Sequence, residues 1–384
     1  MTPAETFRVA MQGGRPDRVP VAPKIWIDLA ARLTATPLRE VLADPRLAMR
    51  VIIDAAVAVG ADAARQFLFP SRQTVEEDGR LFEVDAAGRR VGEIDLAGGL
   101  ATHRAAEEFV LENPAHVAFR GCWIRHTPFV RSLADVRRIA VPTREFFQSL
   151  GYGNIVRQMQ AHAASRVELL GDCDSATLAF VEGFRTLDEA LADLIENPSL
   201  VHALMEKGEE CAIERGRFWM DTGVRVLRVN DSIGNMSVIS PRHWREFVFP
   251  HLKNVCAELH RYGPDVKIYC HICGNVLPIL EGLVEAGLDC IAPLDPLGGF
   301  SVGQARRIVG DQMVLMGGVN TLSFVQSSPA EIHAEALRCI QQGEVNGGRF
   351  ILGSGCALPR DARLENLRAL ADAAGAVRKP PETQ

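Results

Sequence analysis

The stretch "YCHICGNVLP" (269–278) carries two cysteines and a histidine in a strand-like run that Gly274 and Asn275 interrupt. Side chains two residues apart in a strand share a face, so His271 and Cys273 lie together while Cys270 points the other way. A C-x-x-C redox pair needs both sulfurs at a helix N-terminus, which disfavours that chemistry here. Imidazole and thiolate are ligand types that zinc prefers. The stretch is therefore a candidate for two ligands of a zinc site, although a single His or Cys in a strand is more often an ordinary buried residue.

A third ligand is expected at Cys356 in "GSGCALP", which follows the apolar strand "RFILG". If both strands belong to one parallel barrel, their carboxyl ends open on the same rim, so Cys356 could meet His271 and Cys273 there. The glycine-rich strand ends "GGVN" and "GSG" leave a phosphate site on this rim as a rival interpretation. The remaining cysteines are interpreted as core residues: 122, 173, 211, 256, 290 and 339.

These residues need a scaffold of alternating strands and helices. Apolar, β-branched runs at 224–231, 266–273, 288–295, 313–320 and 349–355 are separated by helix-length amphipathic stretches, which indicates a buried parallel sheet. Further strand candidates lie at 167–172, 62–69 and 17–23. About eight strands without a G-x-G-x-x-G turn favour an α/β fold of the (β/α)8 TIM barrel type. Residues 81–96 predict an inserted β-hairpin, 1–377 a single domain, and 378–384 a disordered tail.

Composition excludes several function classes. The 384 residues are 47% hydrophobic and 23% charged with a net charge of −6, which is typical of a globular protein and disfavours nucleic-acid binding. No apolar run approaches the roughly 20 residues of a membrane span, and the N-terminus lacks the apolar stretch of a secretory signal. A cytoplasmic protein with reduced cysteines is expected. Assembly as a homodimer is left open.

Several segments together resemble the uroporphyrinogen decarboxylase superfamily. "GGRPDRVPVAPKIW" is similar to its N-terminal motif, and "ISPRHWREFVFPHLKNV" to its S-P-x-x-(Y/W)-x-E-F-x-x-P-x-x-K segment. "HICGN", "MGGVNT" and "LPRDARLENLRAL" are similar to its later motifs. The resemblance runs over nearly the whole chain and implies a barrel. It implies one of two chemistries: tetrapyrrole decarboxylation without a cofactor, or zinc-dependent methyl transfer involving a corrinoid.

Departures from the decarboxylase pattern favour the methyltransferase branch. The decarboxylases carry an R-Q-A-G-R segment and a catalytic aspartate, whereas this chain has "IWIDLAARL" and, near Phe69, "QFLFPSR". A substrate with many carboxylates would bind poorly without cations to pair them. The methyltransferase branch, which includes methylcobamide:coenzyme M methyltransferases and corrinoid-dependent demethylases, has a His-x-Cys…Cys zinc site. His271, Cys273 and Cys356 match it in residue type and order.

The resemblance thus predicts methyl transfer between a small-molecule donor and the cobalt of cobalamin. No D-x-H-x-x-G segment is present, so the cobalamin is expected on a separate corrinoid protein. A methoxylated donor is favoured, and methyl transfer from methylcobamide to a zinc-bound thiol is the reverse alternative. Decarboxylation and a non-enzymatic corrinoid-binding role are the other hypotheses.

Candidate residues around the zinc come from the other strand ends. Asp231 and Glu182 are predicted as acids that donate a proton, bind substrate or add a fourth ligand, although Asp231 could instead cap a helix. Asp295 lies on the same rim. The predicted substrate-binding residues are Trp26, Phe67, Asn230 and Asn320, with Phe69 as a further pocket candidate.

Overall fold

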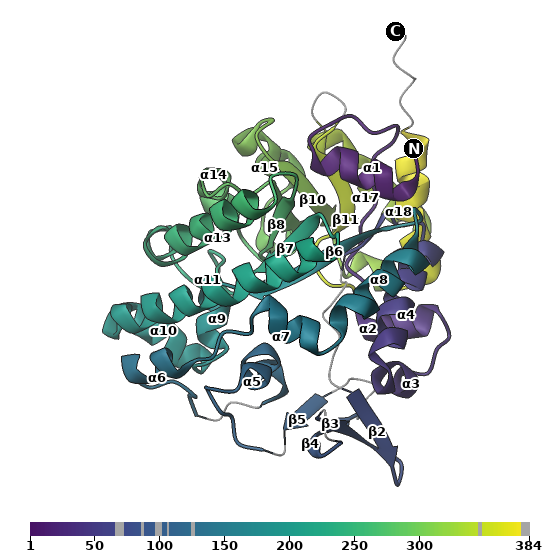
Figure 1. The fold of residues 1–384 in the computed structure, drawn as a ribbon. Coiled ribbons are helices and arrows are strands. Elements are labelled where there is room, and N and C mark those ends of the chain that lie inside the picture. Colours follow the sequence, from purple (N-terminus) through teal and green to yellow (C-terminus); the bar gives the residue numbers. More distant parts are fainter. Residues whose placement is uncertain are drawn as a thin grey trace.

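The structure is a computed structural model that describes residues 1–65, 73–85, 88–96, 102–105, 107–123, 127–344 and 348–377. The predicted pocket residues Phe67 and Phe69 and the predicted tail 378–384 lie outside these residues. Figure 1 shows helices wrapped around one curled parallel sheet, with a small antiparallel sheet set apart from it.

Seven parallel strands form the main sheet, each paired with the next along the chain. They are β1 (Ala63–Ala64), β6 (Glu168–Ser175), β7 (Val226–Asn230), β8 (Lys267–His271), β9 (Cys290–Leu294), β10 (Val314–Val319) and β11 (Phe350–Ser354). Every predicted strand from 167 onward is confirmed in position. The fold is therefore α/β with a TIM-like curled sheet.

The predicted eighth strand is not formed. Residues 20–24 make isolated bridges, Val21 with Leu352 and Lys24 with Ala357, and the Asp62 amide donates to the Val21 carbonyl at 2.7 Å. Pro20 and Pro23 have no N–H to donate, which interrupts a regular ladder. The predicted closed (β/α)8 barrel is therefore wrong. The structure has a seven-stranded half-barrel with an extended segment bridged to β11.

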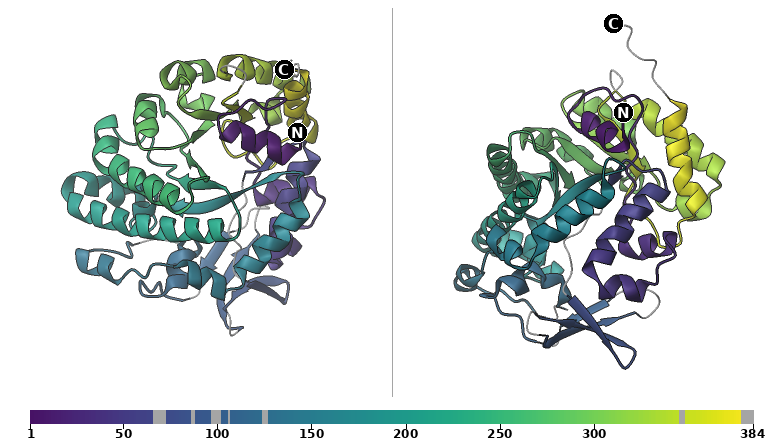
Figure 2. Two further views of the ribbon diagram at one scale, coloured as in Figure 1. Left: turned by 45° about the horizontal axis from the view of Figure 1, so that its top comes forward. Right: turned by 45° about the vertical axis from the view of Figure 1, so that its right-hand side comes forward.

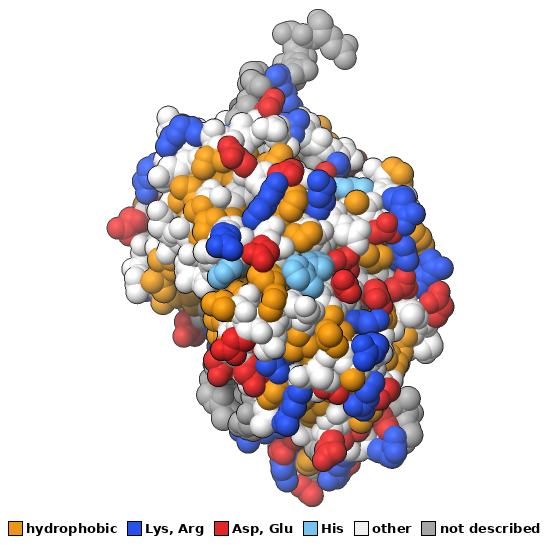
Figure 3. All heavy atoms as spheres, turned by 90° about the vertical axis from the view of Figure 1, so that its left-hand side faces the viewer, with side chains coloured by type: hydrophobic (Ala, Val, Ile, Leu, Met, Phe, Trp, Pro, Cys, Tyr) orange, Lys and Arg blue, Asp and Glu red, His pale blue; other side chains and the backbone are white. Residues whose placement is uncertain are grey.

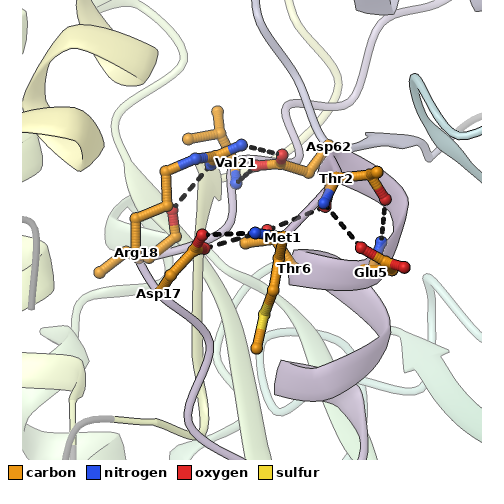
Figure 4. Close-up of polar contacts among 9 residues, drawn as sticks. Met1, Thr2, Glu5, Thr6, Asp17, Arg18, Val21 and Asp62 are labelled. Atoms are coloured by element: carbon orange, nitrogen blue, oxygen red, sulfur yellow. Dashed lines mark hydrogen bonds and ion pairs between the residues drawn. The ribbon is translucent and has the colours of Figure 1, made fainter. Parts of the chain in front are cut away.

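Ionic contacts fix this extended segment near the N-terminus (Figure 4). The Arg18 guanidinium contacts both carboxylate oxygens of Asp62, one of them at 2.7 Å, and Asp62 also accepts from the Val21 amide at 2.7 Å. The Met1 ammonium pairs with Asp17 at 2.8 Å. The "DRVP" motif therefore holds the chain that carries Lys24.

The predicted hairpin is part of a larger sheet. Four antiparallel strands follow one another: β2 (Gln73–Glu77), β3 (Arg80–Val84), β4 (Arg90–Asp95) and β5 (Thr102–Ala105). The predicted 81–96 hairpin corresponds to β3 and β4. Leu81 and Ile94 pack with Leu42, which anchors the inserted sheet on the helices that follow residue 24.

Helices cover the outer face of the parallel sheet. In Figure 2 α4 (dark purple) and α18 (yellow) lie side by side, and Arg368 donates to the Ala58 carbonyl at 3.1 Å. The helices are α1 (Pro3–Met11), α2 (Ile27–Leu33), α3 (Leu38–Ala43), α4 (Pro45–Ala58), α5 (Pro114–Ala118), α6 (Leu133–Arg138), α7 (Arg144–Ser149), α8 (Tyr152–Ala163), α9 (Leu178–Glu182), α10 (Leu187–Glu196), α11 (Pro198–Asp221), α12 (Pro241–His243), α13 (Phe249–Tyr262), α14 (Leu280–Glu285), α15 (Val302–Val309), α16 (Ser323–Gln326), α17 (Pro329–Gly343) and α18 (Leu364–Ala376). A π-helical turn, η3 (Trp244–Val248), joins α12 to α13 just before Pro250, and short 3-10 turns are η2 (Arg120–Cys122), η4 (Leu277–Ile279) and η5 (Pro296–Gly298).

The inner face of the curled sheet is filled in layers. An apolar layer combines strand residues with Phe7, Ala10 and Met11 of α1, which lies against β1, β6 and β11. Its members include Ala22, Ala63, Leu170, Val226 and Tyr269. Because side chains alternate along a strand, the residues two positions further on also face inward. These are Lys24, Arg65, Asp172, Arg228 and His271, and all five are buried.

The outer surface mixes charge types. On the face in Figure 3, acidic and basic side chains are interspersed with apolar ones. Among the described helices, none combines the length and the apolar composition that a membrane span requires.

Candidate metal centre

Three predicted ligands converge at the carboxyl ends of β8 and β11. His271 ends β8, Cys273 follows two residues later, and Cys356 comes two residues after β11 ends. Nε2 of His271 lies 3.1 Å from Sγ of Cys273, which lies 3.1 Å from Sγ of Cys356. The three ligand atoms all lie within 4.8 Å of one another. The fold thus brings together the three side chains that the sequence analysis predicted as zinc ligands.

The donor set fits zinc. Tetrahedral zinc with Zn–S near 2.3 Å and Zn–N near 2.0 Å would separate two sulfurs by about 3.8 Å and a nitrogen from a sulfur by about 3.5 Å. The observed separations are 3.1 Å, so the side chains would move apart by about half an ångström. Two thiolates and a neutral imidazole would balance the two positive charges of the ion. Nε2 of His271 is the nitrogen that faces the sulfurs, and Nδ1 is buried without a hydrogen-bond partner among the described residues.

The two thiols are electronically unequal. The hydrogen bond from Cys273 lowers the pKa of Cys356 to about 6, and the nearby Lys24 contributes to this shift. The same hydrogen bond, together with burial, raises the pKa of Cys273. The pair therefore holds one thiolate readily at neutral pH, and a metal ion would be needed to stabilise both.

Lys24 is part of this centre, and sequence reasoning missed it. Its Nζ atom lies 2.9 Å from Nε2 of His271, and its side chain is buried. Burial, with Arg228 and Arg65 nearby, lowers the pKa of Lys24 to about 7. The available signal was its spacing: Lys24 lies two residues after the inward-facing Ala22.

Two arginines lie in the same inward-facing layer. Arg228 pairs with Asp172, with its Nε and Nη2 atoms 3.0 and 2.9 Å from the same carboxylate oxygen. Arg65 is only 2% exposed, and its three guanidinium nitrogens have no hydrogen-bond partner among the described residues. The layer contains two guanidinium groups, the Lys24 amine and one carboxylate, so it carries excess positive charge next to His271.

Asp231 is connected to a helix. Its backbone amide donates to the His271 carbonyl at 3.0 Å, while its carboxylate accepts from the Ala179 amide at 2.8 Å in the first turn of α9. It is fully buried, and burial raises its pKa to about 6. Asp231 thus caps a helix, although not the one that follows its own strand. The catalytic role remains a prediction.

The other predicted site residues lie in different surroundings. Trp26 is 38% exposed, and its ring lies 5.4 Å from Lys24 Nζ, which places it beside the centre. Asn230 pairs in register with His271. The Asn320 side chain accepts from the Leu322 amide and stabilises a local turn. Glu182 is the last residue of α9 and is half-buried.

Asp295 supports the loop that carries Cys273. One carboxylate oxygen accepts from the Leu297 amide at 3.0 Å, and the other lies 3.4 Å from the Gly274 amide. Gly274 has φ of 75°, a left-handed conformation that glycine adopts without strain. Asp295 thus positions the loop rather than pointing freely from the rim.

Comparisons with known proteins show which family this chain resembles. The family model described as Uroporphyrinogen decarboxylase (URO-D) matches residues 121–377. The uroporphyrinogen decarboxylase of Chlorobium phaeovibrioides is 29% identical over 262 residues, covering 65% of this chain and 71% of that protein. The methylated-thiol–coenzyme M methyltransferase of Methanosarcina mazei is 26% identical over 174 residues, covering 45% of this chain and 44% of that protein.

A solved structure extends the likeness over the full length. A methyltransferase from Methanosarcina mazei superimposes with a TM-score of 0.73 at 18% identity and covers 98% of this chain and 99% of its own. At this identity the match is one of fold. Because it covers 98% of this chain, it includes most of the N-terminal 120 residues that lie outside the family-model match.

Proposed function

This chain belongs to the uroporphyrinogen decarboxylase family, and from that premise we propose that it is a zinc-dependent methyltransferase. It moves a methyl group between a small molecule and the cobalt of a corrinoid carried on a separate protein. The observation that carries this proposal is the convergence of His271, Cys273 and Cys356. The likeness to methyltransferases in sequence and in fold supports it.

His271, Cys273 and Cys356 would hold the zinc through one nitrogen and two sulfurs. Bound there, zinc would supply Lewis acidity, either holding a substrate thiol as its thiolate or polarising the oxygen of a methyl ether. Three protein ligands leave a position for that sulfur or oxygen. The half-burial of both cysteines is consistent with access from the rim.

The inward-facing cationic side chains favour a substrate with an anionic group. Zinc with two thiolates is neutral, so the two guanidinium groups of Arg65 and Arg228 exceed Asp172 by one positive charge, to which Lys24 adds when it is protonated. The Arg65 guanidinium is buried without a hydrogen-bond partner among the described residues, which costs several kcal/mol, and a bound anion would reduce this cost. We therefore propose that the small molecule bears an anionic group that binds Arg65, while Trp26 contacts its apolar part.

The test uses purified protein, reduced cobalamin and a panel of methoxylated and methylthiolated acids, with methylcobalamin formation followed by absorbance. We expect transfer to require zinc and to fall at least a hundredfold in Cys356→Ser, because one of the metal ligands is lost. Cys211→Ser, a half-buried cysteine of α11, is the matched control. Undiminished methyl transfer by metal-free protein would contradict the proposal.

Decarboxylation is the second candidate, because the chain is 29% identical to a uroporphyrinogen decarboxylase over 65% of its length. It predicts loss of carboxylates from uroporphyrinogen without any metal. Residues 25–33 lack the two arginines of the R-Q-A-G-R segment that is typical of the decarboxylases, so we expect no turnover. Turnover that survives Cys356→Ser would instead favour this second candidate.

A further inference from the structure

A second group of metal-ligand side chains lies in the inserted sheet. Glu83 comes from β3, His103 from β5 and Cys122 from the end of η2. One potential ligand atom from each lies within 4.8 Å of the others. Sequence reasoning assigned Cys122 to the core, whereas the structure leaves it half-buried with its sulfur 3.7 Å from Oε1 of Glu83.

Glu83 is the unusual member of this group. Its side chain is 1% exposed, and Oε1 lies 3.1 Å from Nδ1 of His103. The second oxygen, Oε2, is buried without a hydrogen-bond partner in the described chain. A protonated His103 would satisfy Oε1 and leave Oε2 unpaired. An unpaired buried carboxylate oxygen is costly, and a cation bound to the carboxylate would reduce that cost.

The spacing matches a metal site. Around tetrahedral zinc, a carboxylate oxygen and an imidazole nitrogen would lie about 3.4 Å apart, and an oxygen and a sulfur about 3.5 Å apart. The observed separations are 3.1 and 3.7 Å. A Cβ atom on Gly92 would come within 2.8 Å of Oε2, so the glycine leaves the space that the carboxylate occupies.

We propose that Glu83, His103 and Cys122 bind a second zinc ion. One carboxylate, one thiolate and a neutral imidazole balance its charge, and the mixture of oxygen, nitrogen and sulfur ligands suits zinc better than magnesium or calcium. The ion joins β3 to β5, which are separated by β4, and ties both to η2. It therefore fastens the inserted sheet to the segment that follows it.

The test removes the first centre, so its result is independent of the proposed function. The triple variant His271→Ala, Cys273→Ser, Cys356→Ser is incubated with zinc, desalted and analysed for metal. We expect about one zinc per chain, with one sulfur ligand by X-ray absorption, against about two zinc ions in the wild-type protein. No retained zinc in a folded triple variant overturns the proposal.

Further variants assign the retained ion. Adding Cys122→Ser to the triple variant should remove it, whereas adding Cys211→Ser should not. If either protein fails to fold, His103→Gln in the otherwise wild-type chain decides, because His103 lies partly at the surface. Its zinc content should fall from about two ions to about one. Zinc content unchanged by His103→Gln or by Cys122→Ser overturns the assignment.

Discussion

Nζ of Lys24 lies 2.9 Å from Nε2 of His271, the same ring nitrogen that lies 3.1 Å from Sγ of Cys273. One lone pair therefore faces both the lysine and the proposed metal position. A metal ion bound to Nε2 would replace the contact with Lys24. The lysine is held in place because its chain segment is bridged to β11 and because the ion pair between Arg18 and Asp62 fixes the residues before it.

Replacing Lys24 with methionine should tighten zinc binding. A hydrogen bond that involves a charged group contributes roughly 1.5–3 kcal/mol, and zinc no longer has to break it in the variant. Loss of the attraction between the ammonium and the thiolates offsets part of this gain. The expected net effect is about tenfold higher affinity, or about 1.4 kcal/mol. Competition with a chromophoric chelator measures it.

Lys267→Met is the control for Lys24→Met. Lys267 lies at the start of β8 and pairs with Asp289 at 2.7 Å. Its replacement should leave zinc affinity unchanged. Weaker zinc binding by Lys24→Met would show that the ammonium mainly stabilises the thiolates.

Arg65→Met should separate stability from function. The buried guanidinium has no hydrogen-bond partner among the described residues, so its removal should raise the free energy of unfolding of the ligand-free protein by about 1–4 kcal/mol. The same variant should raise KM at least tenfold for an anionic methyl donor and leave a neutral donor unaffected. Urea unfolding and steady-state kinetics measure the two effects. Equal losses for both donors would contradict the anion-binding role.

The zinc ligands could be predicted from the sequence because few residue types bind zinc. His271 and Cys273 share a face because the strand period is two, and Cys356 joins them because parallel strands end on one rim. Lys24 and Arg65 were missed because a single lysine or arginine in an apolar run does not show which way it points. That direction depends on how residues 20–24 and β1 pair with their neighbours.

Other differences between the prediction and the structure also have identifiable causes. The 81–96 hairpin was predicted from its central turn, but β2 and β5 lack strong apolar alternation and were not recognised. Asp231 lies at a strand end as predicted, yet its carboxylate binds an amide of α9, which begins beyond a different strand. Contacts of this kind are set by tertiary packing.

Asp62→Ala should destabilise the fold. Asp62 is fully buried, and its carboxylate binds the Arg18 guanidinium and the Val21 amide. Removing it leaves a partly buried cation and a buried amide unpaired, so the free energy of unfolding should fall by about 3–5 kcal/mol. Asp17→Ala removes a half-exposed pair with the Met1 ammonium and should cost under about 1 kcal/mol. Similar urea midpoints for the two variants would contradict this ranking.

Glu168→Gln should remove a specific pH dependence of stability. Glu168 begins β6, and burial raises its pKa to about 7 although Arg8 lies 3.0 Å away. Between pH 4.5 and 7 the folded state binds more protons than the unfolded state, so the stability contributed by this group is present below pH 4.5 and is lost as pH rises through 7. The expected loss in the wild-type protein is about 3 kcal/mol. Urea unfolding from pH 4.5 to 8 should show this decline in the wild-type protein and a flatter profile in Glu168→Gln. Arg8→Gln, which removes the pairing cation, should steepen the decline, and parallel profiles for all three proteins would contradict the assignment.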